Sequence, residues 1–252
     1  MRWPPPSDWP NVTHSRQLFC RPHRWHVQET GSGPTLLLIH GAGGSTHSFA
    51  AVIPLLARQF HVVAIDLPGQ GYTQLGARHR SGLAPMVEDI SMLCDHNGWV
   101  PTAIIGHSAG AAIALQLSGL ILSPRGQPPR VIGINAALDH FEGIAGLLFP
   151  ALAKVLAGLP FSANAFSAMS ATPSRIQSLI SSTGSNLDPS GLEFYRRLVG
   201  DRSHVDATLL MMAQWSLEPL LKKIRNIETP ALFIVGQKDR TVPPRVSHQS
   251  AA

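Results

Sequence analysis

The chain has 252 residues, of which 44% are hydrophobic and 14% charged, with a formal net charge of +5. This length and apolar content predict one globular domain with a sizeable core. The arginines are scattered and form no basic stripe with aromatic residues, which argues against nucleic acid as a partner. Cys20 and Cys94 form no C-x-x-C pair, so we expect a reducing compartment and no metal site.

The first half of the chain alternates apolar runs with helical patterns. The N-terminus lacks the apolar stretch of a signal peptide, which favours a cytoplasmic location. Two short strands are predicted over 17–20 and 24–28. The run at 35–39 is typical of a strand buried on both faces of a parallel sheet, and the next strand is predicted over 61–65. Ser45 can cap one helix whose apolar residues are Phe49, Val52, Ile53, Leu55 and Leu56. A further helix is predicted over 86–96.

The next strand ends in Gly106-His107-Ser108-Ala109-Gly110, and a helical pattern of small apolar residues follows it. A G-x-S-x-G sequence between a strand and a helix is typical of a nucleophile elbow. The glycines two residues either side of the serine would avoid side-chain collisions in this sharp, strained turn. We therefore expect Ser108 to be a nucleophile. The alternative is a glycine-containing turn with an accidental serine.

The second half begins with a strand over 130–135, after which the alternation breaks down until about residue 214. Residues 144–161 carry one charge, Lys154, but prolines interrupt them, which favours a helical lid over a membrane span. An amphipathic helix over 217–227 and a buried strand over 231–235 follow. We expect a doubly wound, mostly parallel sheet, with core residues 1–138, a lid at 139–214 and a second core part at 215–252.

Four motifs in chain order resemble the α/β-hydrolase superfamily. They are His40-Gly41, Asp66-Leu67-Pro68-Gly69-x-Gly71, the pentapeptide at 106–110, and Gly236-x-x-Asp239. Passages at 24–28, 46–49, 183–189 and 211–215 are similar to the magnesium-chelatase accessory proteins of bacteriochlorophyll synthesis, a group within this superfamily. That resemblance implies a porphyrin ligand, such as protoporphyrin IX or its magnesium derivative. It also implies magnesium-chelatase subunits as partners and no resident cofactor.

A serine nucleophile requires a base, and a carboxylate that orients a histidine base. Asp239, directly after the strand at 231–235, is the expected acid; the alternatives are an Asx-turn role for Asp239, or Asp139 as the acid. Superfamily members place the histidine after one further strand, whereas this chain ends at Ala252. We therefore expect the last strand, the histidine loop and the closing helix to be missing, in either a fragment or a catalytically inactive copy.

Other residues have roles that the resemblance implies. The backbone N–H groups of Ala42 and Ala109 are the expected oxyanion donors. His40, Gly41 and His107 are expected to line the site, with His40 holding its loop by hydrogen bonds, and residues 66–71 to form a structural turn. Three histidines could overhang Ser108 as substitute bases, although each fits a solvated surface position: His47, His140 and His204. His248 is expected to face away.

The apolar lid residues suggest the class of ligand. Side chains such as Phe149, Met211, Met212 and Trp215 would roof a cavity suited to a large, flat, apolar molecule, although ordinary lid packing is the alternative. Three functions remain open at this point. The first is a chelatase accessory protein. The second is a serine hydrolase, namely an esterase, a lipase or a C–C-bond hydrolase. The third is a non-catalytic protein that either binds a pigment or rests its lid on a bilayer as a peripheral membrane protein.

Overall fold

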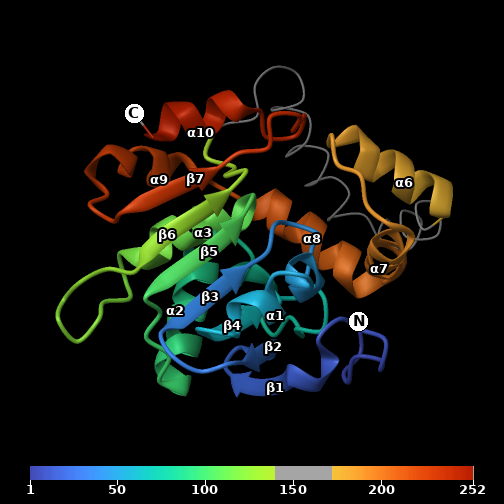
Figure 1. Ribbon diagram of the computed structural model, residues 1–252, viewed down its shortest axis with the longest axis horizontal. Helices are drawn as coiled ribbons and strands as arrows, with labels where there is room; N and C mark the ends of the chain where they lie inside the picture. Colours follow the sequence, from blue (N-terminus) through green and yellow to red (C-terminus); the bar gives the residue numbers. More distant parts are fainter. Residues whose placement is uncertain (140–171, 252) are drawn as a thin grey trace.

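A computed structural model describes residues 1–139 and 172–251 of the chain. These residues form a seven-stranded sheet in the order β1-β2-β4-β3-β5-β6-β7 (Figure 1). β1 and β2 are antiparallel to each other, β2 is antiparallel to β4, and the remaining neighbours are parallel. The strands are β1 (Ser15–Cys20), β2 (His23–Thr30), β3 (Thr35–Ile39), β4 (His61–Ile65), β5 (Ala103–His107), β6 (Arg130–Ile134) and β7 (Ala231–Ile234).

Helices connect the parallel strands and cover the sheet. The α-helices are α1 (Ile53–Leu56), α2 (Leu83–Asn97), α3 (Ala109–Ser118), α6 (Pro173–Ser182), α7 (Pro189–Gly200), α8 (Arg202–Gln214), α9 (Glu218–Leu221) and α10 (Pro244–Ala251). Short 3-10 helices are η1 (Val12–His14), η2 (Thr46–Phe49), η3 (Arg78–Arg80) and η4 (Ile224–Asn226). Among the described residues, no helix is long and apolar enough to cross a membrane.

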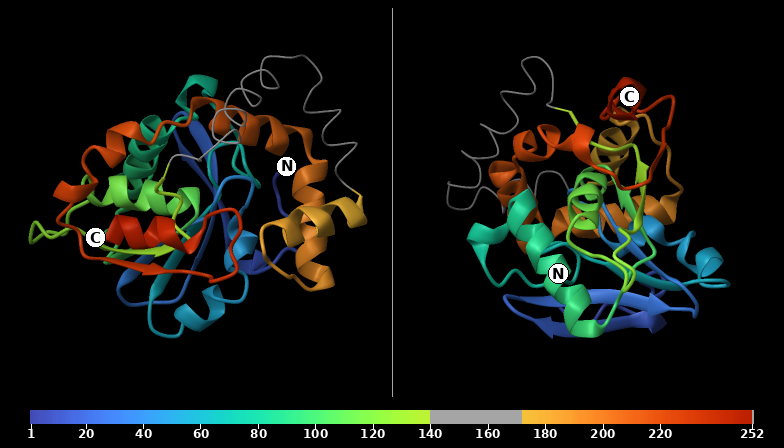
Figure 2. Two further views of the ribbon diagram at one scale, coloured as in Figure 1. Left: turned by 90° about the horizontal axis from the view of Figure 1, so that it is seen from above. Right: turned by 90° about the vertical axis from the view of Figure 1, so that its left-hand side faces the viewer.

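The central strands are apolar on both faces because each face is covered. Successive side chains of a strand point to opposite sides of the sheet. Leu37 and Ile39 of β3 therefore pack in one core cluster with α2 and α3, while Leu36 and Leu38 pack in a second with η2 and α1. Figure 2 shows helices on both sides of the sheet. The doubly wound, mostly parallel sheet predicted from the sequence is confirmed.

Among the described residues, four α-helices lie between β6 and β7, and we call the first three of them, α6, α7 and α8, the inserted helices. Figure 1 places them on the side of the molecule toward which β3, β5 and β6 point. The lid predicted at 139–214 includes them. The apolar stretch at 144–161, with Lys154, lies outside the described residues.

Two predicted helices are each divided into shorter pieces. The helix predicted after Ser45 is η2 followed by the single turn α1, because Pro54, which has no backbone N–H, begins a new turn. Of its apolar residues, Val52 and Leu55 are 42% and 59% exposed. The helix predicted over 217–227 is α9 and η4, separated by Lys222 and Lys223, of which Lys223 has φ −103° and ψ −8°.

The prediction of a buried strand over 231–235 is wrong for part of its length. Leu232 and Ile234 of β7 are 58% and 51% exposed. Within the described residues, β7 pairs only with β6, so it is an outer strand of the sheet. Phe233 alternates to the other face and packs against the core.

The segment before β1 is attached to the inserted helices by aromatic contacts. The Trp9 ring lies edge-on to Tyr72 at 5.1 Å and to Phe194 at 5.3 Å between ring centroids. Tyr72 follows β4, and Phe194 belongs to α7. These residues form a small separate core with Leu198, which fixes α7 against the body of the protein.

Candidate active site

Ser108 occupies the sharp turn between β5 and α3. Its backbone has φ 54° and ψ −118°, outside the regions that non-glycine residues favour. A Cβ atom at Gly106 would lie 2.3 Å from the Gly110 carbonyl oxygen, and one at Gly110 would lie 2.2 Å from the Ile39 carbonyl oxygen. Only glycine fits these two positions. The strand, turn and helix therefore have the geometry of a nucleophile elbow, while the chemical role of Ser108 stays a prediction.

The loop after β3 approaches this turn closely. A Cβ atom at Gly41 would lie 3.0 Å from Ser108 Cβ and 3.2 Å from His107 Nδ1. The next residue, Ala42, is half-buried and packs against the same core cluster as Ala109. The two expected oxyanion donors thus belong to segments that meet at Ser108.

His40 holds the loop after β3 by hydrogen bonds, as expected from the sequence. The ring is fully buried, its Nδ1 lies 2.7 Å from the Gly41 carbonyl oxygen, and its Nε2 accepts a hydrogen bond from Leu67 N at 2.9 Å. Since the Leu67 N–H requires an acceptor, Nδ1 carries the proton and donates to Gly41. Burial lowers the pKa of His40, which keeps the ring neutral. Both ring nitrogens are therefore occupied.

Gln70 connects the same loop to the inserted helices. Its Oε1 accepts a hydrogen bond from Gly43 N at 2.7 Å, and its Nε2 lies 3.1 Å from Met211 Sδ of α8. Gln70 and Met211 are both buried. The predicted ligand-lining residue Met211 is thus used, at least in part, to hold Gln70 in place.

A second connection to α8 passes through His204. Its Nδ1 accepts a hydrogen bond from Gly71 N at 3.0 Å, and its Nε2 lies 3.2 Å from the Gly43 carbonyl oxygen. The neutral ring therefore joins the loop after β3 to the loop after β4. Burial is the main reason that the pKa of His204 is lowered to about 4.

His47 is also buried, contrary to the prediction of solvated positions for His47 and His204. Their exposed fractions are 6% and 2%. The His47 ring packs at 4.6 Å from the Tyr195 ring, and its Nδ1 is paired with Ser45 Oγ at 2.6 Å. Burial lowers the pKa of His47 to about 3. His140, the third suggested substitute base, lies outside the described residues.

Asp66 fixes the turn at 66–71, as its structural interpretation predicts. Its buried carboxylate accepts hydrogen bonds from Thr46 N at 2.6 Å and Tyr72 N at 2.8 Å, and His26 Nδ1 lies 2.6 Å away. Burial alone would raise the pKa of Asp66, but the His26 ring and the N–H donors outweigh it and lower the pKa to about 2.

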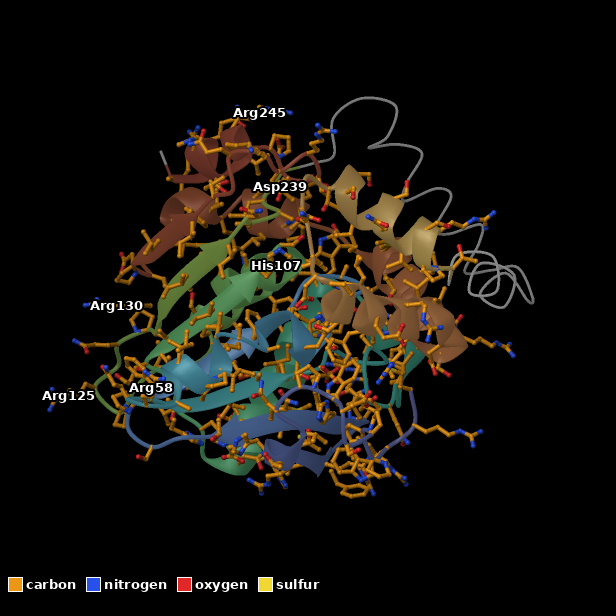
Figure 3. All side chains as sticks on the ribbon, turned by 45° about the vertical axis from the view of Figure 1, so that its right-hand side comes forward. Arg58, His107, Arg125, Arg130, Asp239 and Arg245 are labelled. Atoms are coloured by element: carbon orange, nitrogen blue, oxygen red, sulfur yellow. The ribbon has the colours of Figure 1, made fainter. Side chains whose placement is uncertain are left out.

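Asp239 lies in the loop after β7, at the same end of the sheet as His107 (Figure 3). Its Oδ1 accepts hydrogen bonds from Thr241 N at 2.7 Å and Val242 N at 2.8 Å, and its Oδ2 accepts one from the Asn135 side chain. The bond to Thr241 N is the Asx-turn considered as an alternative. The carboxylate has therefore a structural use in addition to the acid role predicted for it.

No described histidine is placed as a base for Ser108. Within residues 1–139 and 172–251, no side chain forms a hydrogen bond with the Ser108 hydroxyl. His107 precedes the serine, and burial lowers its pKa although the nearby Asp239 charge opposes this shift. His248, in α10, is exposed, as expected for a residue that faces away from the site. Asp139, the alternative acid, is half-buried after β6.

The remaining predicted ligand contacts differ in exposure. Met212 of α8 is 38% exposed, whereas its neighbour Met211 is buried. Trp215, directly after α8, is partly buried and packs against the main core cluster. Phe149 lies outside the described residues. In the described part of the chain, no group of three or more His, Cys, Asp or Glu side chains could hold a metal ion.

Sequence reasoning did not single out Gln70 or Asn135. Asn135 directly follows β6, and a polar residue at the carboxyl end of a parallel strand could have been predicted to belong to the site. Its side chain donates to Asp239 and accepts from Gly236 N at 2.7 Å. Gln70 lies within the motif at 66–71, but its partners Gly43 and Met211 are distant in sequence and gave no local signal.

The strand order, the turn that holds Ser108 after β5 and the position of Asp239 after β7 are typical of one class of protein, the α/β hydrolases. The family model for the alpha/beta hydrolase fold matches residues 34–252. The chain belongs to the α/β hydrolase family.

Two relatives and one solved structure are similar to this chain over most of its length. The chain is 46% identical over 248 residues to the magnesium-chelatase 30 kDa subunit of Rhodobacter capsulatus, covering 98% of this chain and 86% of that protein. It is 26% identical over 229 residues to the pimeloyl-[acyl-carrier protein] methyl ester esterase of Xanthomonas axonopodis pv. citri, covering 90% and 85%. The structure of an alpha/beta hydrolase fold protein from Burkholderia ambifaria aligns with TM-score 0.72 at 21% identity, covering 94% and 88%, which supports the fold.

Proposed function

We propose that this protein is an α/β-hydrolase-fold accessory protein for magnesium insertion into protoporphyrin IX in bacteriochlorophyll synthesis. The observation that carries the proposal is the 46% identity to the Rhodobacter capsulatus magnesium-chelatase subunit, which covers 98% of this chain. Similarity over that length includes the sheet, the loops around Ser108 and the inserted helices. In this function the protein binds the pigment, magnesium is the substrate ion, and the chelatase subunits are the partners.

The surface of the inserted helices supports an apolar pigment as the ligand. Leu179 of α6 and Met212 of α8 are 50% and 38% exposed, so two of these helices present large apolar side chains to solvent. Methionine is flexible and polarizable and adapts well to flat ring systems. The hydrogen bonds of Gln70 and His204 fix α8 beside the loop after β3. We therefore propose that the pigment lies between the inserted helices and Ser108.

Ser108 and the loop amides would serve the polar part of the ligand. Backbone N–H groups that converge beside a hydroxyl can hold a carbonyl oxygen without any covalent step. In this function the pigment is bound and transferred without ester cleavage. We propose Ser108, Ala42 and Ala109 as the groups that contact such an oxygen.

A serine esterase is the second candidate. The strained backbone of Ser108, with φ 54°, is the observation that favours it, because this strain is typical of reactive residues. In that reaction the Ser108 hydroxyl would attack an ester carbonyl while a base accepts its proton, and Asp239 would orient the base. Hydrolysis of p-nitrophenyl butyrate that is lost in Ser108→Ala would support this candidate.

Pigment binding is tested by titrating the protein with protoporphyrin IX and following the Soret absorption band. The variant Met212→Arg should weaken binding about tenfold, because it places a charge where the apolar ring would lie. The control is Met92→Arg, which changes another exposed helical methionine, 45% exposed on α2. Unsaturable binding, or equal loss in both variants, would contradict the proposed site.

A further inference from the structure

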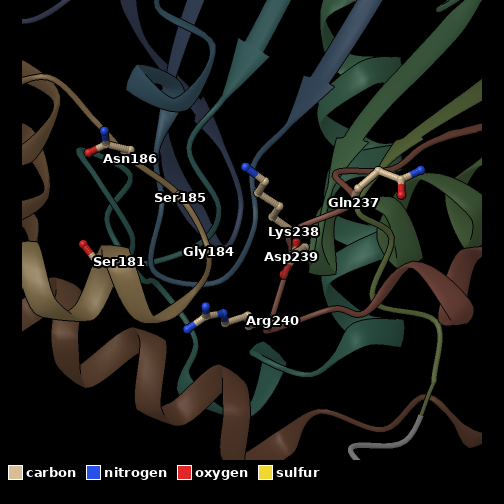
Figure 4. Close-up of a pocket in the computed structure, with 8 residues that line it drawn as sticks. All are labelled: Ser181, Gly184, Ser185, Asn186, Gln237, Lys238, Asp239 and Arg240. Carbon is tan, nitrogen blue, oxygen red and sulfur yellow. The ribbon is translucent and has the colours of Figure 1, made fainter.

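A pocket lies directly beside Asp239, between the loop after β7 and the connection from α6 to α7 (Figure 4). The two segments are joined by a hydrogen bond from Arg240 N to the Thr183 carbonyl oxygen at 3.0 Å. They approach so closely at Gly184 that a Cβ atom there would lie 2.0 Å from the Lys238 carbonyl oxygen. The pocket has a volume of about 460 Å³, within the range of ligand sites.

Two cationic side chains line this pocket, Lys238 and Arg240. Among the described residues, neither the Lys238 ammonium nor the Arg240 guanidinium forms an ion pair. Asp239 stands between them in sequence, but its carboxylate accepts its hydrogen bonds from Asn135, Thr241 and Val242 instead. In Figure 4 both cationic side chains extend toward the α6–α7 connection, whereas Gln237 extends to the other side.

The remaining polar groups of the pocket can also donate hydrogen bonds. Ser181 and Ser185 supply hydroxyl groups, and Asn186 supplies a side-chain amide. A guanidinium fork matches the two oxygens of a carboxylate, and an ammonium adds a point charge. Unpaired positive charge and neutral donors together favour an anionic ligand group over a cation or an apolar one.

We infer that this pocket binds the carboxylate groups of the ligand, next to the Ser108 site. The identity of that ligand rests on the proposed function, but the carboxylate preference rests only on the pocket. Protoporphyrin IX carries two propionate groups on one edge of an apolar ring. Its ring would lie against the inserted helices while the propionates contact Lys238 and Arg240. The pocket would thus orient the pigment as well as hold it.

The first experiment tests the pocket without the pigment. Succinate is titrated into the isotope-labelled protein at low ionic strength, and the backbone amide shifts of Gly184, Ser185 and Lys238 are followed. Saturable shifts confined to this region are expected, and they should vanish in the double variant Lys238→Gln with Arg240→Gln. The double variant Arg58→Gln with Arg130→Gln removes the same charge far from Asp239 (Figure 3) and should keep them. Shifts that do not saturate would overturn the inference.

The second experiment tests the same pocket with the pigment. The pocket variant should bind protoporphyrin IX about tenfold more weakly than the native chain and the control variant. Binding of the dimethyl ester, which has no free carboxylate, should be the same in all three proteins. Equal protoporphyrin IX affinities in all three would overturn the inference and leave the proposed function standing. Saturable succinate binding without any pigment binding would overturn the proposed function and leave the carboxylate site.

Discussion

Asn135, at the end of β6, donates a hydrogen bond from its side-chain amide to the Asp239 carboxylate in the loop after β7. The same side chain accepts a hydrogen bond from Gly236 N at 2.7 Å. Asn135 thereby adopts φ 44°, a conformation that asparagine tolerates better than most residues. One side chain thus sets the loop that carries both the candidate acid and the two cations of the adjacent pocket.

Replacing Asn135 should therefore loosen this loop. We expect Asn135→Ala to lower the free energy of unfolding by about 1–2 kcal/mol, because the carboxylate and the Gly236 N–H lose a partner. Urea unfolding at pH 7 measures this change. The control Asn226→Ala, at an exposed residue of η4, should change it by about 0.5 kcal/mol or less. Equal stability of the two variants would contradict the positioning role of Asn135.

The loop after β3 should depend on Gln70 in a similar way. In Gln70→Leu the Gly43 N–H loses its acceptor, so hydrogen exchange in residues 41–44 should become faster. Exchange followed by mass spectrometry measures this effect. The exposed Gln127 provides the control substitution, Gln127→Leu. Unchanged exchange at 41–44 in Gln70→Leu would show that the loop is held by other contacts.

Backbone strain at Ser108 should be visible in stability. Glycine tolerates positive φ, so Ser108→Gly should be more stable than Ser108→Ala by about 1 kcal/mol. The opposite order is expected at the exposed Ser178, in the middle of α6, where alanine is the better helix former. Thermal or urea unfolding of the four variants gives the comparison. The same order at both positions would argue against strain at the elbow.

Much of the fold could be predicted because its signals are local. The strands at 35–39 and 61–65 have the predicted bounds, since a continuous apolar run specifies a strand buried on both faces. The nucleophile elbow could also be predicted, because its glycines and its serine lie close together in the sequence. The helix after Ser45 was predicted from its apolar residues alone, and the interruption at Pro54 was not foreseen.

The contacts that organise the candidate site could not be predicted in this way. Gln70 and Met211 are 141 positions apart, and Asn135 and Asp239 are 104 positions apart. His204 was predicted to be solvated because helix position alone does not reveal its partners, Gly71 and Gly43, in two distant loops. Such pairings arise only in the folded chain, where the loops at the carboxyl ends of the strands meet one another and the inserted helices.

Burial of His47 and His204 should make the protein sensitive to acid. Their native pKa values, about 3 and about 4, lie below the ordinary value of 6.5. Between pH 6.5 and these lowered pKa values, the unfolded state binds protons that the native state excludes. The free energy of unfolding therefore falls as the pH is lowered through this range. Each histidine contributes up to about 1.4 kcal/mol per pH unit below pH 6.5, and this loss is absent above it.

Urea unfolding at pH 7.5, 6 and 5 tests this dependence. His204→Asn should be less stable than the native chain at pH 7.5, yet its stability should decline less steeply toward pH 5. The exposed His248 supplies the control, and His248→Asn should keep the native slope. An unchanged slope in His204→Asn would mean that the ring accepts a proton in the folded state.

The rate of magnesium insertion into protoporphyrin IX by the magnesium-chelatase subunits tests the central claim most directly. The rate is measured at fixed subunit and pigment concentrations while this protein is added, with the Met212→Arg and Met92→Arg variants in parallel. We predict that the native chain and Met92→Arg raise the rate severalfold and that Met212→Arg does so only at higher concentration. A rate that the native chain leaves unchanged, at concentrations that saturate pigment binding, would contradict the proposed accessory function.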